Sequence, residues 1–111
     1  MRILFLALLT SCTSSVATVV WPEGGPPLND YFSMEVHVED ESVTGLAVNA
    51  DMPSHGHGMI TRPVVEQIRP GVWRVDGMMF HMPGFWELYL DLERGKEVTQ
   101  EIHEVTLEHR S

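Results

Sequence analysis

Hydrophobic and polar residues alternate one by one in three separate stretches of the chain. These stretches read MEVHV at residues 34–38, LAVNA at residues 46–50 and WELYLDL at residues 86–92. Such alternation is typical of β-strands that bury one face and leave the other in water. No part of the sequence repeats its hydrophobic residues with the period of an α-helix. The pattern therefore predicts an all-β protein.

Turn-forming residues separate further strands. Arg69-Pro70-Gly71-Val72 predicts a tight turn between a strand in residues 61–68 and one in residues 72–81, and Arg94-Gly95-Lys96 predicts a second turn. A short strand is expected at residues 18–21. Short strands with turn signals about every 8–12 residues indicate a β-sandwich. We therefore expect an immunoglobulin-like antiparallel β-sandwich of about six to seven strands.

The N-terminus, MRILFLALLTSC, is predicted to be a lipoprotein-type signal peptide over residues 1–11. One positive charge precedes an apolar run, Ile3 to Leu9, that is far shorter than the roughly 20 residues of a membrane-spanning helix. The end of that run resembles a bacterial lipobox, in which Cys12 becomes the lipidated first residue. The alternative is an ordinary secretory signal that is cleaved after Ser15-Val16-Ala17. Cys12 is the only cysteine, so no intramolecular disulfide is possible.

The remaining chain divides into a tether and one domain. Residues 12–29, rich in Ser, Thr, Gly and Pro, are predicted to form the lipidated N-terminus and a flexible tether. Residues 30–111 are predicted to form the β-sandwich domain. A length of 111 residues suits a single core.

The charge of the chain bears on its partners. Sixteen acidic residues against seven basic ones give a formal charge of -9, which repels phosphate backbones and argues against nucleic acid as a partner. With the signal peptide, this composition predicts a protein on the periplasmic side of a bacterial membrane, held there by its lipid anchor alone. A soluble periplasmic protein is the second choice.

Two clusters of histidine and methionine are the candidate functional residues. They read MPSHGHGM at residues 52–59 and MMFHMPG at residues 78–84. Antiparallel order of the predicted strands would place both clusters at the same end of the sandwich. The candidate metal ligands are His55, His57, His81, Met52, Met59 and Met82.

The donor types indicate which metal such a site would hold. Thioether sulfur is a soft ligand that suits copper, above all Cu(I), whereas imidazole suits copper and zinc alike. A set of His and Met without cysteine therefore favours copper, and the nearby acid Asp51 leaves zinc as an alternative. Gly56 and Gly58 give the loop the freedom to fold both histidines toward one centre. Met52 and Met82 each precede a proline and can equally fill the top of the core.

The strand that begins at residue 72 leaves two alternatives open for His81. If Trp73 and Val75 face inward, strict alternation also turns Met79 and His81 inward. A β-bulge at Gly77 would instead place Phe80 and Met82 inside and His81 at the rim. Met34, Trp73 and Trp86 are expected in the core in either case.

The same residues carry a resemblance to a known family. The stretches ADMPSHGHGM, RPGVWRVDGMMF and HMPGFWELYLDL resemble the YtkA-like family of small exported bacterial β-sandwich domains, which is similar to the FixH-type accessory proteins. The resemblance covers roughly residues 31–92, and the first strand of the family pattern is weak in this chain. It implies an immunoglobulin-like fold, an envelope location and a link to copper handling. The family's MP-x-H-x-H loop and MPG-x-W corner match Met52, Pro53, His55 and His57, and Met82, Pro83, Gly84 and Trp86.

The leading functional hypothesis is an envelope-located copper-binding protein that serves storage, tolerance or delivery to an exported cuproenzyme. The alternative is a non-metal protein-interaction domain of a periplasmic lipoprotein. An enzyme is not expected, because no serine or cysteine nucleophile has a recognisable setting and only Asp51 could orient a histidine base.

Overall fold

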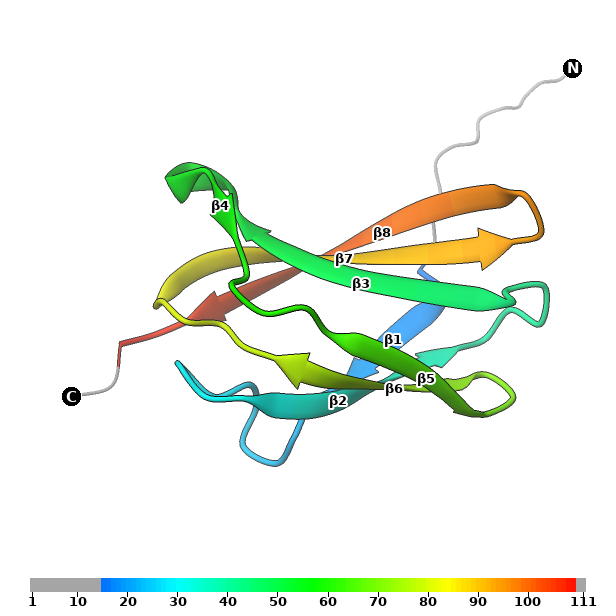
Figure 1. The fold of residues 1–111 in the computed structure, drawn as a ribbon, viewed down its shortest axis with the longest axis horizontal. Helices are drawn as coiled ribbons and strands as arrows, with labels where there is room; N and C mark the ends of the chain where they lie inside the picture. Colours follow the sequence, from blue (N-terminus) through cyan, green and yellow to red (C-terminus); the bar gives the residue numbers. More distant parts are fainter. Residues whose placement is uncertain (1–14, 110–111) are drawn as a thin grey trace, which may run out of the picture.

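Two antiparallel four-stranded sheets pack against each other in the computed structural model, which describes residues 15–109 (Figure 1). The strands of the first sheet, in spatial order, are β1 (Ala17–Val20), β2 (Phe32–Val38), β6 (Val72–Met78) and β5 (Val64–Arg69). Those of the second sheet are β4 (His57–Gly58), β3 (Gly45–Met52), β7 (Gly84–Arg94) and β8 (Glu97–Leu107). A 3₁₀ turn, η2 (Pro53–His55), joins β3 to β4.

This strand order is that of an immunoglobulin-type sandwich. In chain order the strands correspond to A, B, C, C′, D, E, F and G, with A-B-E-D in one sheet and C′-C-F-G in the other. The predicted all-β sandwich is confirmed, and the two-residue β4 is added to the seven longer strands. Within residues 15–109, no helix has the length and apolar character that crossing a membrane requires.

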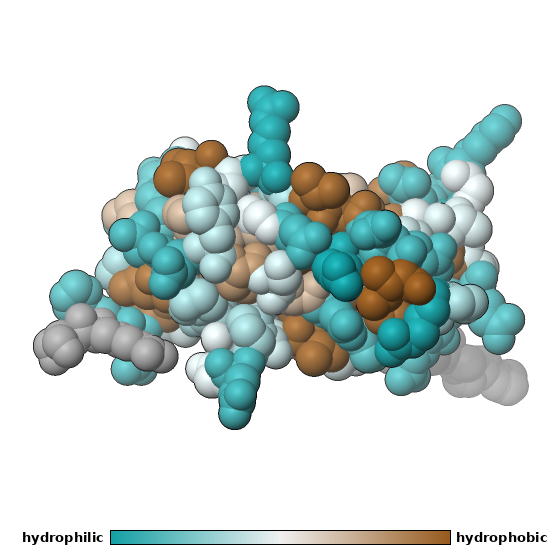
Figure 2. Space-filling view, turned by 60° about the horizontal axis from the view of Figure 1, so that its bottom comes forward, coloured by the Kyte–Doolittle hydropathy of each residue, from teal (hydrophilic) through white to brown (hydrophobic). Residues whose placement is uncertain are grey.

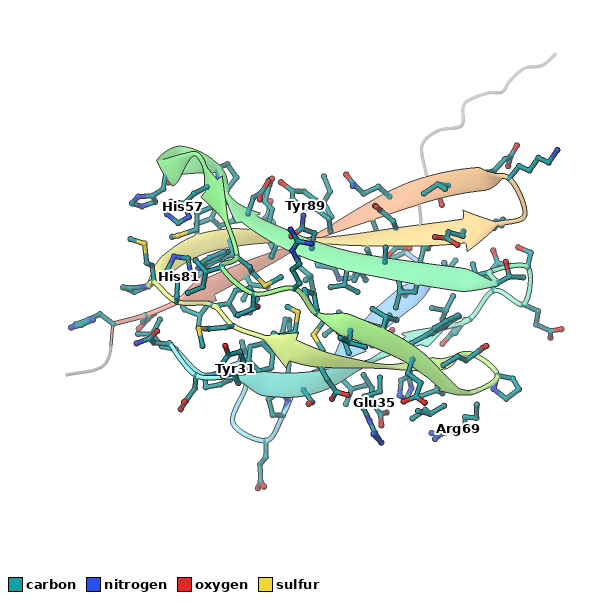
Figure 3. The ribbon with its side chains drawn as sticks, in the orientation of Figure 1. Tyr31, Glu35, His57, Arg69, His81 and Tyr89 are labelled. Atoms are coloured by element: carbon teal, nitrogen blue, oxygen red, sulfur yellow. The ribbon has the colours of Figure 1, made fainter. Side chains whose placement is uncertain are left out.

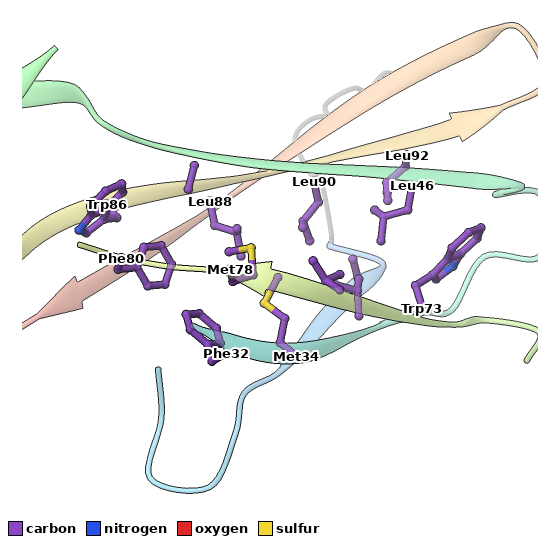
Figure 4. Packing of buried hydrophobic residues seen from close by; sticks show 14 of the residues in the cluster. Phe32, Met34, Leu46, Trp73, Met78, Phe80, Trp86, Leu88, Leu90 and Leu92 are labelled. Carbon is purple, nitrogen blue, oxygen red and sulfur yellow. The ribbon is translucent and has the colours of Figure 1, made fainter. Parts of the chain in front are cut away.

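The alternating stretches place their apolar side chains between the sheets (Figure 4). Met34, Val36 and Val38 on β2 are buried, while the intervening Glu35 and His37 are half exposed. On β7 the buried residues are Trp86, Leu88, Leu90 and Leu92. Period-two alternation thus decides which face of each strand joins the core.

A β-bulge interrupts β6 at the point where the sequence left two alternatives. Phe32 pairs with Met78 but Met34 pairs with Val75, so three steps on β6 match two on β2. Gly77 has a φ of 82°, a left-handed conformation that glycine adopts without strain. Strict alternation is therefore wrong beyond Gly77, and Phe80 is fully buried as the bulge predicts. The shifted phase leaves His81 half-buried at the rim.

The tether predicted for residues 12–29 is too long and needs correction. β1 pairs with β2 over its whole length, and Ala17 belongs to the buried core. Trp21 packs against the rings of Phe32 and Phe80, with centroids 6.1 and 6.2 Å away. The composition predicted a tether with one short strand at residues 18–21; this strand is β1, and the apolar residues before Pro22 belong to the sandwich. The predicted signal peptide and Cys12 lie outside the described residues.

Predicted strand limits differ by a few residues from the observed ones. The strand expected in residues 61–68 begins only at Val64, after Pro63, and the strand expected in residues 72–81 ends at Met78. The two predicted turns are confirmed, since Arg69 pairs with Val72 and Arg94 pairs with Glu97.

The carboxylate of Asp40 ties the turn after β2 to the end of β7. It accepts hydrogen bonds from the hydroxyl and the backbone N–H of Ser42 at 2.6 and 2.9 Å, and from Arg94 Nη2 at 2.9 Å. These contacts, with those from Ser42 the strongest, lower the pKa of Asp40 from 3.8 to about 2. Because the folded pKa is depressed, the stabilising contribution is present above about pH 3.8 and is lost as the pH falls toward 2.

We expect Asp40→Asn to lower the thermal unfolding midpoint at neutral pH, because the charged acceptor is lost. The difference from the wild type should shrink as the pH falls toward 2, where Asp40 itself becomes neutral. Scanning calorimetry over this pH range measures the difference, with Glu39→Gln as the control at an exposed neighbour. A difference that stays constant down to pH 2 would contradict this role of Asp40.

Candidate metal centre

The two His/Met clusters lie at the same end of the sandwich. β3 ends at Met52, the η2 turn follows, and β4 folds back so that Met52 pairs with His57 and Asp51 with Gly58. The second cluster follows β6 and leads into β7. Figure 3 shows His57 and His81 close together at this end, on segments that are more than twenty residues apart in the sequence. The predicted convergence of the clusters is therefore present.

Glycines allow the first cluster to turn back on β3. Gly56 ends the η2 turn with a φ of 68°. A Cβ on Gly58 would lie 2.6 Å from Asp51 Oδ1 and 3.0 Å from the carbonyl oxygen of Ala50, so a larger residue would push β4 away from β3. The close β3–β4 pairing therefore places His57 next to Met52 at the end of the second sheet.

Three imidazole rings follow one another across this end. The ring centroids of His55 and His57 are 5.8 Å apart, and those of His57 and His81 are 5.2 Å apart. His57 and His81 are half-buried, whereas His55 is exposed. The geometry thus joins His57 and His81 most closely, with His55 at the outer end of the row.

The Trp86 ring lies beneath the two inner imidazoles. It meets His57 and His81 edge-on, with centroid distances of 6.3 and 5.6 Å, and it packs on Phe80 at 5.1 Å. Its Nε1–H donates a hydrogen bond to the carbonyl oxygen of Met82 at 3.0 Å. Trp86 therefore links the core to both halves of the candidate site.

His81 carries a buried polar atom without a partner. Its Nδ1 is inaccessible and makes no hydrogen bond to any of the described residues, whereas buried polar atoms are nearly always bonded. His57 Nδ1 lies 3.2 Å from the carbonyl oxygen of Gly58. In the tautomer that donates this bond, the lone pair of His57 is on Nε2 and is free for a ligand.

The methionines of the two clusters differ in burial. Met52 is fully buried and belongs to the core cluster. Met59 and Met82 are half-buried and pack against the core from its edge. The thioethers of Met59 and Met82 are consequently the ones that remain partly accessible at this end.

Other potential ligands are few around these rings. Within residues 15–109, no group of three or more His, Cys, Asp or Glu side chains is arranged to hold a metal ion. Asp51 is half-buried and lies across from Gly58 in the β3–β4 pair. The donors that the fold does gather here are imidazole nitrogens and thioether sulfurs.

The sequence placed Trp86 in the core but did not predict its contacts with the candidate metal site. Its contact with both imidazoles and its hydrogen bond to the Met82 carbonyl follow from the tight corner at Pro83-Gly84. The sequence signal for this arrangement is the short spacing of MPG-x-W, which places the indole only four residues after Met82.

Comparisons with known proteins add no relative. A scan against models of protein families, a search of curated proteins and a search of solved structures each gave no match. The resemblance to the YtkA-like family stays a prediction.

Proposed function

We propose that this chain is a copper-binding protein of the bacterial cell envelope, which holds one Cu(I) ion at the His/Met end of the sandwich. The observation that carries the proposal is the pair of His57 and His81. Their ring centroids are 5.2 Å apart, and His81 has a buried nitrogen that lacks a hydrogen-bond partner among residues 15–109. In the tautomer that carries its proton on Nε2, the Nδ1 of His81 has a lone pair that the described residues leave unused and that metal coordination would use.

The donor types support copper over other metals. His57 and His81 would supply nitrogen ligands, with Met59 and Met82 as the sulfur ligands. A neutral set of imidazoles and thioethers suits Cu(I) better than harder cations. Asp51 is the only carboxylate of the loop and keeps zinc as the less favoured metal. Met52, which is fully buried, would act as a core residue rather than as a ligand.

The surroundings of the rings suit a Cu(I) site as well. The indole of Trp86 and the ring of Phe80 close the inner side of the pair and are both fully buried. They would keep water away from that side and hold the imidazoles in place when no metal is bound. His55, exposed and next to His57, would be the first ligand that an incoming ion meets.

The predicted signal sequence and lipobox support an envelope location. A lipid at Cys12 would tether the domain to the membrane, while the His/Met end lies on loops at one end of the sandwich. Storage, tolerance and delivery to an exported cuproenzyme are the roles that such a protein would serve.

A protein-interaction domain is the second candidate function. Tyr31 and Ile60 are each 70% exposed, and both lie on segments at the His/Met end. Figure 2 shows a face on which hydrophobic groups form separate patches among hydrophilic ones. Exposed apolar side chains mark a surface that meets another protein where they join into one contiguous patch, which Tyr31 and Ile60 would form with a partner bound at this end. This candidate predicts that a partner binds equally well with and without copper.

A Cu(I) titration against a coloured competing chelator tests the proposal. Residues 13–111 contain every residue of the described core, so a chain of this length keeps the whole sandwich. We expect tight binding of one ion at about pH 7.5 and weaker binding at about pH 5.5, because protons compete for the imidazole nitrogens. Absent binding, or an affinity that is the same at both pH values, would contradict histidine ligation.

His81→Phe should have opposite effects on the stability of the metal-free protein and on metal binding. An unsatisfied buried polar atom costs about 1–3 kcal/mol, so His81→Phe should keep or raise the free energy of unfolding of the metal-free protein. Added Cu(I) should stabilise the wild type but not this variant. Urea unfolding with and without Cu(I) measures both effects.

The matched control is His37→Phe, because His37 Nε2 is bonded to Glu35 Oε1 at 2.8 Å. This variant should lose some stability and keep the response to copper. A clear loss of stability in metal-free His81→Phe would contradict an unpartnered His81 Nδ1, because it would show that the ring makes a stabilising polar contact.

A further inference from the structure

The four edge strands of the sandwich differ in how open they are to pairing. β1 has four residues, β4 has two, and β5 has six that are flanked by Pro63 and Pro70 and shifted in register near Arg69. Short strands, prolines and irregularities of this kind protect a sheet edge. β8 has eleven residues, contains no proline and pairs with β7 at every position without a shift. Its other edge has no backbone partner among residues 15–109, although Ser15 Oγ and the Val16 N–H donate hydrogen bonds to the side chain of Glu101.

β8 also exposes apolar side chains beside this free edge. Val98 is 59% exposed and Ile102 is 52% exposed. Ile102 alternates with half-buried residues of β8, which puts it, and Val98 an even number of residues away, on the outer face of the second sheet. A long regular edge strand with exposed aliphatic residues is a template for another strand.

The charges of β8 match a second copy of the same strand. An antiparallel pair with its two-fold axis at Ile102 aligns all eleven residues, because Ile102 is the midpoint of Glu97–Leu107. Position by position, the opposite residues are Glu97 and Leu107, Val98 and Thr106, Thr99 and Val105, Gln100 and Glu104, and Glu101 and His103. No carboxylate faces another, and each Glu101, which already bonds His103 of its own strand at 2.9 Å, lies opposite the His103 of the other copy. An axis one residue earlier would place Glu101 opposite itself, which is unfavourable.

We propose that two copies of this chain associate through β8, with Ile102 at the two-fold axis. The two second sheets then form one continuous sheet of eight strands, in the order β4-β3-β7-β8 and its reverse in the partner. The β4 loops, with their histidines, lie at the two far edges of this sheet and stay open. The inference goes beyond copper binding and does not depend on it.

A cysteine at the axis tests the register. The chain of residues 13–111 lacks Cys12, the only native cysteine, so Ile102→Cys introduces a single thiol. Opposite residues of an antiparallel pair have Cα atoms about 4.5–5.5 Å apart, within the range of a disulfide. We expect Ile102→Cys to form a disulfide-linked dimer rapidly under mild oxidation.

Val98→Cys is the matched control on the same face. In the proposed pairing the two copies of residue 98 are separated by eight residues along the strand, about 27 Å. This variant should therefore cross-link only slowly. Equal cross-linking of the two variants would overturn the proposed register.

Sedimentation equilibrium over a concentration series tests the association itself. Ile102→Lys places two ammonium groups opposite each other and should raise the dimer dissociation constant about tenfold or more. Val64→Lys makes the same charge change at an exposed position on the β5 edge of the other sheet and should leave the constant unchanged. A wild-type chain that stays monomeric throughout, or a dimer that only Val64→Lys disrupts, would overturn the proposal.

Discussion

Replacement of His57 and His81 together by alanine is expected to lower the Cu(I) affinity at least about 100-fold, while the fold is kept. Loss of an outer-shell partner alone typically costs about 10–100-fold in metal affinity, and this change removes two direct nitrogen ligands. The rings come from separate segments, β4 and the connection from β6 to β7, and meet at 5.2 Å. Competition with a coloured chelator measures the change.

The control for this variant removes two histidines from elsewhere. His37 lies near the end of β2 that pairs with Val72, and His103 lies opposite Leu88 within β8, so neither belongs to the His/Met end. His37→Ala with His103→Ala should therefore leave the affinity unchanged. Retained binding in the His57/His81 variant, together with an unchanged circular dichroism spectrum, would contradict a site built on this pair. His55→Ala should have a smaller effect, since its ring is exposed.

Truncation of Trp86 to alanine is expected to cost about 3–5 kcal/mol of unfolding free energy, as is typical of a large aromatic residue removed from a core. Trp86 is fully buried and packs on Phe80 with ring centroids 5.1 Å apart. The same change removes the surface on which both imidazoles rest and the hydrogen bond to the Met82 carbonyl. Copper affinity should therefore fall together with stability, as equilibrium urea unfolding and chelator competition would measure.

Trp86→Phe separates the contribution of apolar packing from that of the hydrogen bond to the Met82 carbonyl. The phenyl ring keeps much of the apolar packing but cannot donate to Met82, so its cost should be well below that of alanine. Trp73→Phe is the comparison at the other buried tryptophan, which lies in the first sheet at β6. It should leave copper binding intact. Equal losses of copper affinity for Trp73→Phe and Trp86→Phe would mean that Trp86 has no special link to the site.

Alternation and turn chemistry were sufficient to predict the sandwich. Met34, Val36 and Val38 are buried because a strand turns every second residue to the same side. Pro70 and Gly71 form the expected turn, with Gly71 at a φ of 77°. The same reasoning brought both His/Met clusters to one end, since antiparallel strands that follow one another return to the same edge.

Other features depend on tertiary contacts that have no local signal. The choice at Gly77 could not be made from sequence, because strict alternation and a bulge are both compatible with VDGMMF and only the pairing with β2 decides. Residues 12–29 resemble a linker in composition, yet Ala17 belongs to the core and Trp21 packs against it. The unpaired Nδ1 of His81 and the full burial of Met52 likewise result from tertiary packing, which the spacing of residues in the sequence does not reveal.

The most direct test of the copper site is a methyl spectrum of residues 13–111 labelled with ¹³C at the methionine methyl groups, recorded before and after one equivalent of Cu(I). Cu(I) is diamagnetic, so each methyl signal remains visible and reports whether its sulfur has bound the ion. We expect large shifts for Met59 and Met82 and small ones for the buried Met34 and Met52, with the imidazole signals of His57 and His81 shifting at the same equivalent. Signals of Met59 and Met82 that stay in place while copper binds would contradict a mixed histidine–methionine site at this end of the sandwich.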